Sequence, residues 1–322
     1  MESLQDNISE LIAHGLDTIQ YPTTAPALYV PIAYTLESGG KRLRPRLLLS
    51  AFAAFAGDRP LKEALPQALG LEIFHNFTLL HDDVMDNADI RRGRPTVHKR
   101  WNENAAILSG DAMLTLATEY IADCKVELLP EVLKLFNTTA MEIYQGQQLD
   151  VDFEERNDVS VEEYIEMIRL KTSVLLGCAC RMGAMLAGAS EEACRAMYEY
   201  GTDLGLAFQL RDDWLDTFGD PLEFGKEIGG DIINAKKTWL LITALQESDG
   251  EVEAILKEDL EPEERVRQIV RTYRSLDIDK RCNALVKEYS EKACGALKGV
   301  AMDGKLYDYF VELARKCADR TH

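Results

Sequence analysis

The chain has 322 residues, of which 46% are hydrophobic and 28% are charged, so it has ample material for the core of a globular protein. Its formal net charge of −19 argues against nucleic acid or an anionic membrane as the main partner. The sequence starts with neither a basic segment nor an apolar leader, and it contains no run of eighteen or more apolar residues. These features indicate a cytoplasmic protein without a membrane span.

The first motif along the chain places three cationic side chains beside a pair of glycines. It reads Gly39-Gly40-Lys41-Arg42-Leu43-Arg44-Pro45. Lysine and arginine in such a setting suit the oxygens of a diphosphate, and arginine can make paired hydrogen bonds to them. A protein with a large negative charge needs such local cations, or metal ions, to attract an anionic substrate.

A helix is predicted over residues 69–84, because apolar side chains recur there at steps of four, four, three and four. These residues are Leu69, Ile73, Phe77, Leu80 and Val84. At the polar end of the stripe stand Asp82, Asp83 and Asp86, and positions 82 and 86 of a helix share one face. Two such carboxylates can hold Mg²⁺, which usually completes its shell with substrate phosphate. The alternative interpretation is a solvated acidic helix end.

A second cationic segment follows the acidic motif within a few residues. It reads Arg91-Arg92-Gly93-Arg94-Pro95. In isolation such a segment is usually a solvated loop, but its position beside the carboxylates favours diphosphate binding. Glycine and proline residues near 57–60, 93–95, 219–221 and 229–230 predict loops, and none of these is long enough to be a domain linker.

The helical spacing recurs near residues 164–176, 197–215 and 239–245, whereas alternating segments joined by hairpin turns are lacking. The pattern predicts a single all-α domain over residues 1–322, built from about ten or more helices. The seven cysteines form no CxxC pair, which suits a reducing compartment, and we interpret them as small core residues.

A second acidic motif follows the apolar helical run over 197–215. Asp212 and Asp216 again form an i, i+4 pair, with Asp213 beside them. Two carboxylates at this spacing repel one another and destabilise a helix, unless a counterion lies between them. Two such pairs in one chain therefore suggest a shared cluster of metal ions.

These motifs, taken together, resemble the trans-polyprenyl diphosphate synthase family in order and spacing over roughly residues 30–245. The resemblance also includes His75, Lys171-Thr172, Phe208-Gln209 and the segment Gly225-Lys226-x-x-Gly229-x-Asp231. It implies a helical bundle around a central cavity, a homodimer, and a cluster of about three Mg²⁺ ions. The implied reaction is the head-to-tail condensation of isopentenyl diphosphate with allylic diphosphates, namely dimethylallyl, geranyl or farnesyl diphosphate.

The resemblance also implies roles for individual residues of this chain. The site for isopentenyl diphosphate comprises Lys41, Arg44, His75 and Arg92. The magnesium ligands are Asp82, Asp86 and Asp212. The cationic contacts of the allylic diphosphate are Arg91, Lys171, Lys226 and Lys236. The oxygens that face the developing allylic cation belong to Thr172 and Gln209.

Product length depends, by this resemblance, on the residues one turn before the first acidic motif, which are Phe77 and Thr78 here. Family enzymes that make farnesyl diphosphate often have two aromatics at these positions or two extra residues inside the motif, and this chain has neither. Long-chain synthases usually have a small residue where Phe77 stands. We therefore expect geranylgeranyl diphosphate, with farnesyl diphosphate as the alternative; the competing interpretation of Phe77 is simple core packing.

Three other functions are less consistent with the residues. A class I terpene cyclase needs a second motif that the string Asn157-Asp158-Val159-Ser160 does not match, because its serine comes one place too early. A His-Asp phosphohydrolase needs several more histidines than the five present. A non-catalytic subunit of a heteromeric synthase would lose its carboxylates, whereas both acidic motifs are intact. His81 lies off the apolar stripe and is expected to be a packing residue.

Overall fold

A computed structural model of the chain describes residues 2–219 and 229–319. The described residues are mainly helical, which confirms the predicted all-α class. The chain divides into two compact units, and each is assembled from three segments that are separate in the sequence. The first unit comprises Met1–Asn137, Ala179–Arg195 and Ala301–Leu306, and the second comprises Thr138–Cys178, Ala196–Val300 and Tyr307–His322. The expectation of a single domain over residues 1–322 stays a prediction.

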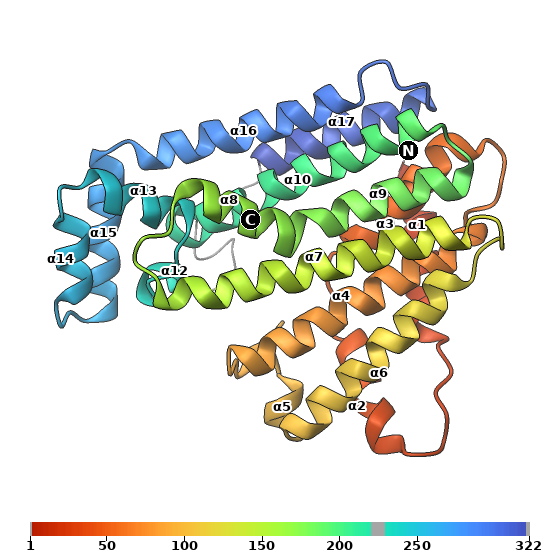
Figure 1. The fold of residues 1–322 in the computed structure, drawn as a ribbon, viewed down its shortest axis with the longest axis horizontal. Helices are drawn as coiled ribbons and strands as arrows, with labels where there is room; N and C mark the ends of the chain where they lie inside the picture. Colours follow the sequence, from red (N-terminus) through yellow and green to blue (C-terminus); the bar gives the residue numbers. More distant parts are fainter. Residues whose placement is uncertain (1, 220–228, 320–322) are drawn as a thin grey trace. The chain divides into compact units, whose positions relative to one another are not determined.

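The first unit contains the N-terminal helices and a short hairpin (Figure 1). Its elements are α1 (Glu2–Asp17), α2 (Pro26–Leu36), α3 (Leu43–Ala56), a 3₁₀ turn (Leu61–Glu63), α4 (Leu65–Met85), β1 (Ile90–Arg91), β2 (Arg94–Pro95), α5 (Val97–Arg100) and α6 (Glu103–Ala122). Four further helices contribute residues to both units; they are α7 (Leu129–Glu155), α9 (Val174–Ala187), α10 (Glu191–Phe218) and α17 (Gly304–Asp319).

Helix α4 carries the predicted stripe of residues 69–84 and packs against α6, with which it runs side by side in Figure 1. Leu71, Ile73 and Phe74 are completely buried on α4. The two helices approach so closely that a Cβ atom on Gly70 would lie 2.9 Å from Cγ1 of Ile121. This packing fixes α4, and with it the acidic motif at its C-terminal end.

The hairpin β1–β2 corrects the expectation that residues 93–95 form only a loop. Ile90 pairs with Pro95 and Arg91 with Arg94 in an antiparallel register. The two turn residues, Arg92 and Gly93, have φ values of 52° and 72°, as a two-residue hairpin turn of the mirror-image type requires. Strands of two residues are too short to produce an alternating pattern, so they could not be predicted from the sequence.

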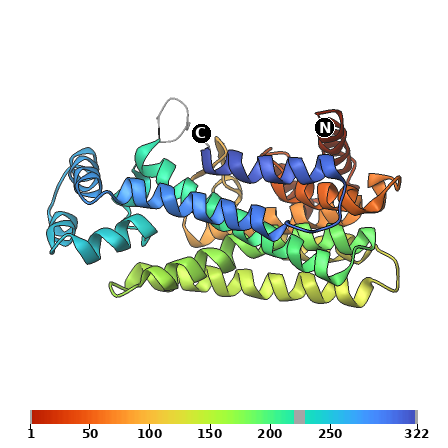
Figure 2. The ribbon, with the colours of Figure 1, turned by 90° about the horizontal axis from the view of Figure 1, so that it is seen from above.

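The second unit contains the C-terminal helices. Its own elements are α8 (Val161–Ile168), a π-helical turn (Arg169–Ser173), α12 (Gly230–Ile233), α13 (Trp239–Glu247), α14 (Glu251–Lys257), α15 (Pro262–Ser275) and α16 (Ile278–Ala296). Helices α16 and α17 lie side by side in Figures 1 and 2. Ser290 of α16 donates a hydrogen bond to the carbonyl of Ala314 at 2.7 Å.

The predicted helix near residues 164–176 is interrupted by the π-helical turn. Helix α8 begins with a capping box between Ser160 and Glu163, which satisfies two backbone donors at its first turn. The chain then widens into the π turn, which contains Lys171 and Thr172. Turns of this kind occur frequently at functional sites.

Among the residues described, the helical stretch Val161–Ala187 is long and apolar enough to cross a membrane by length and composition. However, 83% of its most apolar window is buried inside the structure, as in the core helix of a globular protein. All seven cysteines are free thiols and five of them are buried, in agreement with their interpretation as core residues.

Candidate active site

Arg92 brings two of the sequence motifs together within the first unit. Its Nη1 donates to Ser38 Oγ at 3.2 Å and also to the carbonyl of Gly39. A Cβ atom on Gly40, whose φ is +124°, would lie 2.9 Å from Cζ of Arg92. The glycine pair therefore allows the hairpin turn to approach the loop that carries Lys41.

A buried carboxylate accepts hydrogen bonds from side chains near this approach. Glu72 on α4 is 1% exposed and accepts hydrogen bonds from Arg42 Nη1 at 2.5 Å and from Asn76 Nδ2 at 2.8 Å. Asn76 Oδ1 in turn lies 3.5 Å from Arg92 Nη1. Glu72 and Asn76 were not predicted from the sequence, although two polar residues four apart in an otherwise apolar segment were an available signal.

Arg44 and His75 lie within the same concentration of positive charge. Burial lowers the pKa of Arg44 to about 10, with Glu72 opposing this shift and Arg92 adding to it, so Arg44 remains a cation at neutral pH. Burial, followed by the charges of Arg44 and Arg92, lowers the pKa of His75 well below its usual value. Among the described residues, the buried Nε of Arg44 has no hydrogen-bond partner. Arg44 as a whole is partly exposed, and a cation with a spare donor, beside a neutral imidazole, suits an anionic ligand.

The first acidic motif has the geometry expected from its spacing. Helix α4 runs to Met85, and Asp86 caps it by donating its N–H to the carbonyl of Asp82 at 2.9 Å. Asp82 is partly exposed and Asp86 is exposed. Asp83 is buried and accepts a 2.6 Å hydrogen bond from Arg91 Nε; burial raises its pKa, against the effect of Arg91. Arg91 Nη2 also lies 3.7 Å from Asp82, so the hairpin is anchored to the motif.

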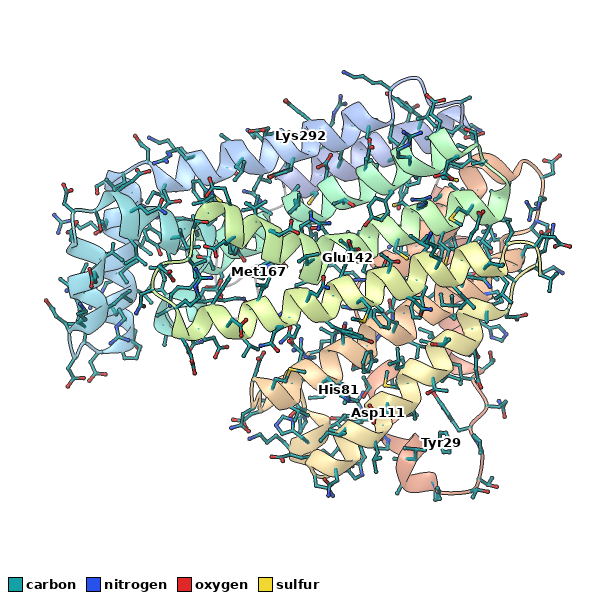
Figure 3. The ribbon with its side chains drawn as sticks, in the orientation of Figure 1. Tyr29, His81, Asp111, Glu142, Met167 and Lys292 are labelled. Carbon is teal, nitrogen blue, oxygen red and sulfur yellow. The ribbon has the colours of Figure 1, made fainter. Side chains whose placement is uncertain are left out.

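Phe77 belongs to an aromatic row along α4. Its ring centroid lies 5.6 Å from that of Phe74 and 4.8 Å from that of His81. His81 packs on α6, where a Cβ atom on Gly110 would lie 2.1 Å from its Nε2; Figure 3 shows His81 beside Asp111, the next residue of α6. His81 is therefore a packing residue in this structure.

Thr78 lies on the neighbouring face of α4 and is partly exposed. Its hydroxyl donates to the carbonyl of His75 at 2.8 Å, whereas Phe77 is 5% exposed. The role of these two residues in product length stays a prediction.

The second unit contains a row of hydrogen-bonded side chains. Thr172 Oγ1 donates to Gln209 Oε1 at 3.2 Å, and Gln209 Nε2 donates to Asp213 Oδ1 at 3.0 Å. The phenol of Tyr164 donates to the other carboxylate oxygen of Asp213. Burial, followed by the charge of Asp231, raises the pKa of Asp213 to about 7. Thr172 and Gln209 were singled out from the sequence, whereas Asp213 and Tyr164, which continue the row, were assigned no role.

Lys171 lies beside Thr172 in the π turn and is held by a residue that the sequence analysis missed. Its Nζ lies 2.5 Å from Oδ2 of Asp150 on α7. The two segments approach closely because α7 carries Gly146, where a Cβ atom would lie 2.3 Å from the backbone nitrogen of Lys171. A glycine inside a helix, four residues before an aspartate, was the signal for this approach.

The second acidic motif lies at the C-terminal end of α10. Asp212 is partly exposed, whereas Asp216 accepts a 2.9 Å hydrogen bond from the backbone N–H of Asp231 in α12. Lys236 is exposed, and its Nζ lies 4.0 Å from the carboxylate of Asp231. Lys226 lies outside the residues that the structure describes.

Across residues 2–219 and 229–319, no group of three or more His, Cys, Asp or Glu side chains is already arranged as a metal site. The available donors are the carboxylates of Asp82 and Asp86 in the first unit and, separately, that of Asp212 in the second, all of them partly or fully exposed. Hard oxygen donors in small number fit Mg²⁺, which binds through one or two carboxylates plus substrate phosphates.

Comparison with known proteins places this geometry in a family. The family model for polyprenyl synthetase matches residues 25–273. Geranylgeranyl diphosphate synthase of Methanosarcina mazei is 41% identical over 268 residues, which covers 80% of this chain and 82% of that one. Geranylfarnesyl diphosphate synthase of Natronomonas pharaonis is 40% identical over 277 residues, covering 79% and 81%. The chain therefore belongs to the polyprenyl synthetase family.

Solved structures agree with this assignment. A crystal structure of geranylgeranyl pyrophosphate synthase, 40% identical, matches with a TM-score of 0.92 over 99% of both chains. A geranylgeranyl pyrophosphate synthase from Corynebacterium glutamicum, complexed with isoprenyl diphosphate and magnesium, is 28% identical and matches with a TM-score of 0.83, covering 99% of this chain and 98% of that one. The predicted family and the predicted enzyme class, a prenyltransferase, are confirmed.

Proposed function

We propose that this protein condenses isopentenyl diphosphate head to tail with allylic diphosphates, in a magnesium-dependent reaction that gives geranylgeranyl diphosphate as its main product. The observation that carries the proposal is a cationic cluster in the first unit, in which Arg44 has a buried donor without a partner among the described residues. The cluster comprises Arg42, Arg44, Arg91 and Arg92, whose charges all act on His75. Arg91 joins this cluster to the acidic motif through Asp83. The cationic side chains suit a diphosphate, and the carboxylates of the acidic motif beside them suit its metal ions.

The two substrates use different residues. The diphosphate of isopentenyl diphosphate binds Lys41, Arg44 and Arg92, and His75 contributes a neutral donor because its pKa is lowered. The allylic diphosphate contacts Arg91, Lys171, Lys226 and Lys236. The pairing of Lys171 with Asp150 at 2.5 Å holds that ammonium group in a fixed position before substrate arrives.

The mechanism follows from the placement of charge. Asp82, Asp86 and Asp212 would hold about three Mg²⁺ ions, which supply positive charge to the departing diphosphate. The arginine and lysine contacts stabilise the same developing charge, so the allylic carbon–oxygen bond ionises; this is electrostatic catalysis. The oxygens of Thr172 and Gln209 face the resulting allylic cation, and the alkene of isopentenyl diphosphate attacks it. In the closing step the new carbocation transfers a proton to the released diphosphate, which leaves the alkene of the product.

We also propose a cytoplasmic homodimer. In support, α6 presents two neighbouring apolar side chains to solvent, Ile107 at 45% and Leu108 at 59% exposure. A second copy of the chain would cover them. Light scattering after size exclusion tests this, since Ile107→Asp combined with Leu108→Asp should convert a dimer into a monomer; a wild-type monomer would contradict the proposal.

The proposed reaction is tested by supplying purified protein with isopentenyl diphosphate and, separately, dimethylallyl, geranyl or farnesyl diphosphate. We expect geranylgeranyl diphosphate as the main product with Mg²⁺ and no product in excess chelator. Farnesyl diphosphate as the main product would support the alternative product, and the absence of any condensation would contradict the proposal.

A further inference from the structure

Two buried residues of the second unit, Asp213 and Tyr164, have no part in the proposed mechanism. Asp213 is nevertheless hydrogen-bonded to Gln209, which has one. Asp213 is 3% exposed and Tyr164 is 1% exposed. Both oxygens of the Asp213 carboxylate are engaged by side chains of this chain, one by Tyr164 and the other by Gln209. Asp213 is therefore not placed as a magnesium ligand, unlike the neighbouring Asp212, which is partly exposed.

The hydrogen bonds of this row have a fixed direction. Because Tyr164 and Gln209 both donate to Asp213, Asp213 acts in this row as an ionised carboxylate that only accepts, and the amide nitrogen of Gln209 faces it. The amide oxygen of Gln209 then accepts a hydrogen bond from the hydroxyl of Thr172, at 3.2 Å. An amide oxygen has two lone pairs, so one remains for a ligand. The only hydroxyl proton of Thr172 is thereby engaged.

This direction determines what the row presents to a ligand. Thr172 and Gln209 are both partly exposed, whereas the two residues behind them are buried. With the Thr172 proton engaged, the lone pairs of its oxygen remain to face outward. Without Asp213, the Gln209 amide could rotate by 180°, and an N–H group would then face the position where positive charge develops.

We propose that Asp213, held by Tyr164, is a positioning residue that keeps Gln209 and Thr172 oriented with their oxygens toward the allylic cation. The inference rests on the proposed function. The phenol of Tyr164 prevents the carboxylate from rotating, and the carboxylate sets the amide. Asp213 touches neither substrate; it acts through Gln209.

The test compares Asp213→Leu, Tyr164→Phe and the double variant. Asp213→Leu leaves the phenol of Tyr164 buried without its acceptor, which lowers stability, whereas the double variant removes both polar partners and should recover thermal stability. We expect kcat to fall roughly ten- to hundredfold in Asp213→Leu and to stay low in the double variant. The KM values for both substrates and the Mg²⁺ requirement should change less than threefold, which corresponds to less than about 0.7 kcal/mol.

A matched control is Tyr200→Phe. Tyr200 is also completely buried in the second unit, and its phenol donates to the carbonyl of Phe310 at 2.8 Å. This variant should lose stability as Tyr164→Phe does but keep its kcat. If kcat recovered together with stability in the double variant, the role of Asp213 would be structural only, and if excess Mg²⁺ restored kcat in Asp213→Leu, Asp213 would be a metal ligand; either result would overturn the proposal.

A second measurement is independent of turnover. Wild-type protein should bind an aza analogue of geranyl diphosphate, which carries an ammonium group where the cation forms, more tightly than geranyl thiolodiphosphate, which is uncharged there. Asp213→Leu should reduce this preference about tenfold. An unchanged preference would contradict the proposed orientation, whereas an inactive wild-type protein would refute the proposed function itself.

Discussion

The cationic cluster of the first unit is suited to an anion, whereas the hydrogen-bonded row of the second unit is suited to a cation. In the cluster, positive charge exceeds the buried carboxylate of Glu72, and Arg44 keeps a donor without a partner among the described residues. In the row, the donors of Thr172 and Gln209 toward their neighbours are engaged, so oxygens are left to face outward. A site for an anion leaves donors available, whereas a site for a cation must engage its donors and leave acceptors.

The largest effect should come from removing the carboxylates that bring metal ions to the reaction. We expect Asp82→Ala, Asp86→Ala and Asp212→Ala each to lower kcat by about two or more orders of magnitude, with the circular dichroism spectrum unchanged. Asp89→Ala is the matched control, because Asp89 is 81% exposed and pairs only at the surface with Lys99. Near-normal turnover of Asp82→Ala in saturating Mg²⁺ would show that the metal assignment is wrong.

The two diphosphate sites should separate in their kinetics. Lys41→Ala or Arg44→Ala should raise KM for isopentenyl diphosphate more than KM for the allylic substrate, by roughly ten- to hundredfold, because a charge-assisted hydrogen bond contributes about 1.5–3 kcal/mol. Arg91→Ala should show the opposite preference, so the variants control for one another. Equal effects on both substrates would remove the distinction between the sites.

Product length should respond to Phe77. Phe77→Ala removes a ring from the row along α4, and if that ring limits the growing chain, the product distribution should shift to longer prenyl diphosphates, measured by chromatography. Phe136→Ala is the control, since Phe136 is a buried ring that packs against Phe74 at 5.1 Å. An unchanged distribution in Phe77→Ala, or the same shift in both variants, would assign Phe77 to core packing.

The smallest effect concerns pH and folding. The pKa of His75 is lowered in the native protein, whereas in the unfolded chain it is about 6.5. As pH falls through that value the unfolded state takes up a proton that the native state does not, so the free energy of unfolding decreases. The contribution is fully present above pH 6.5. In urea unfolding between pH 5 and 8, His75→Gln should flatten this dependence, while His14→Gln, on the exposed surface, should not; an identical slope in wild type and His75→Gln would contradict the assignment.

The sequence predicted the helical class and the family. It also singled out the charged residues assigned to the substrates, because such residues are visible as exceptions in an apolar helical pattern, and their roles stay predictions. It did not predict the residues behind them. Glu72, Asn76, Asp150 and Tyr164 lie on helices whose apolar pattern remains intact around them, and their function depends on contacts between segments far apart in the chain. The hairpin over 90–95 was missed for a different reason. Its strands have two residues each, and its turn depends on a left-handed backbone conformation at Arg92, beside Gly93.

The contrast between an intrinsic anion site and a metal-dependent one can be measured directly by calorimetry with non-reacting ligands. Binding of isopentenyl diphosphate, for which Lys41, Arg44 and Arg92 supply the positive charge, should persist in the presence of a chelator. Binding of geranyl thiolodiphosphate, for which Asp82, Asp86 and Asp212 need metal ions, should require Mg²⁺ and should be abolished in Asp82→Ala. Tight binding of the thiolodiphosphate without Mg²⁺, or loss of isopentenyl diphosphate binding on chelation, would contradict the account.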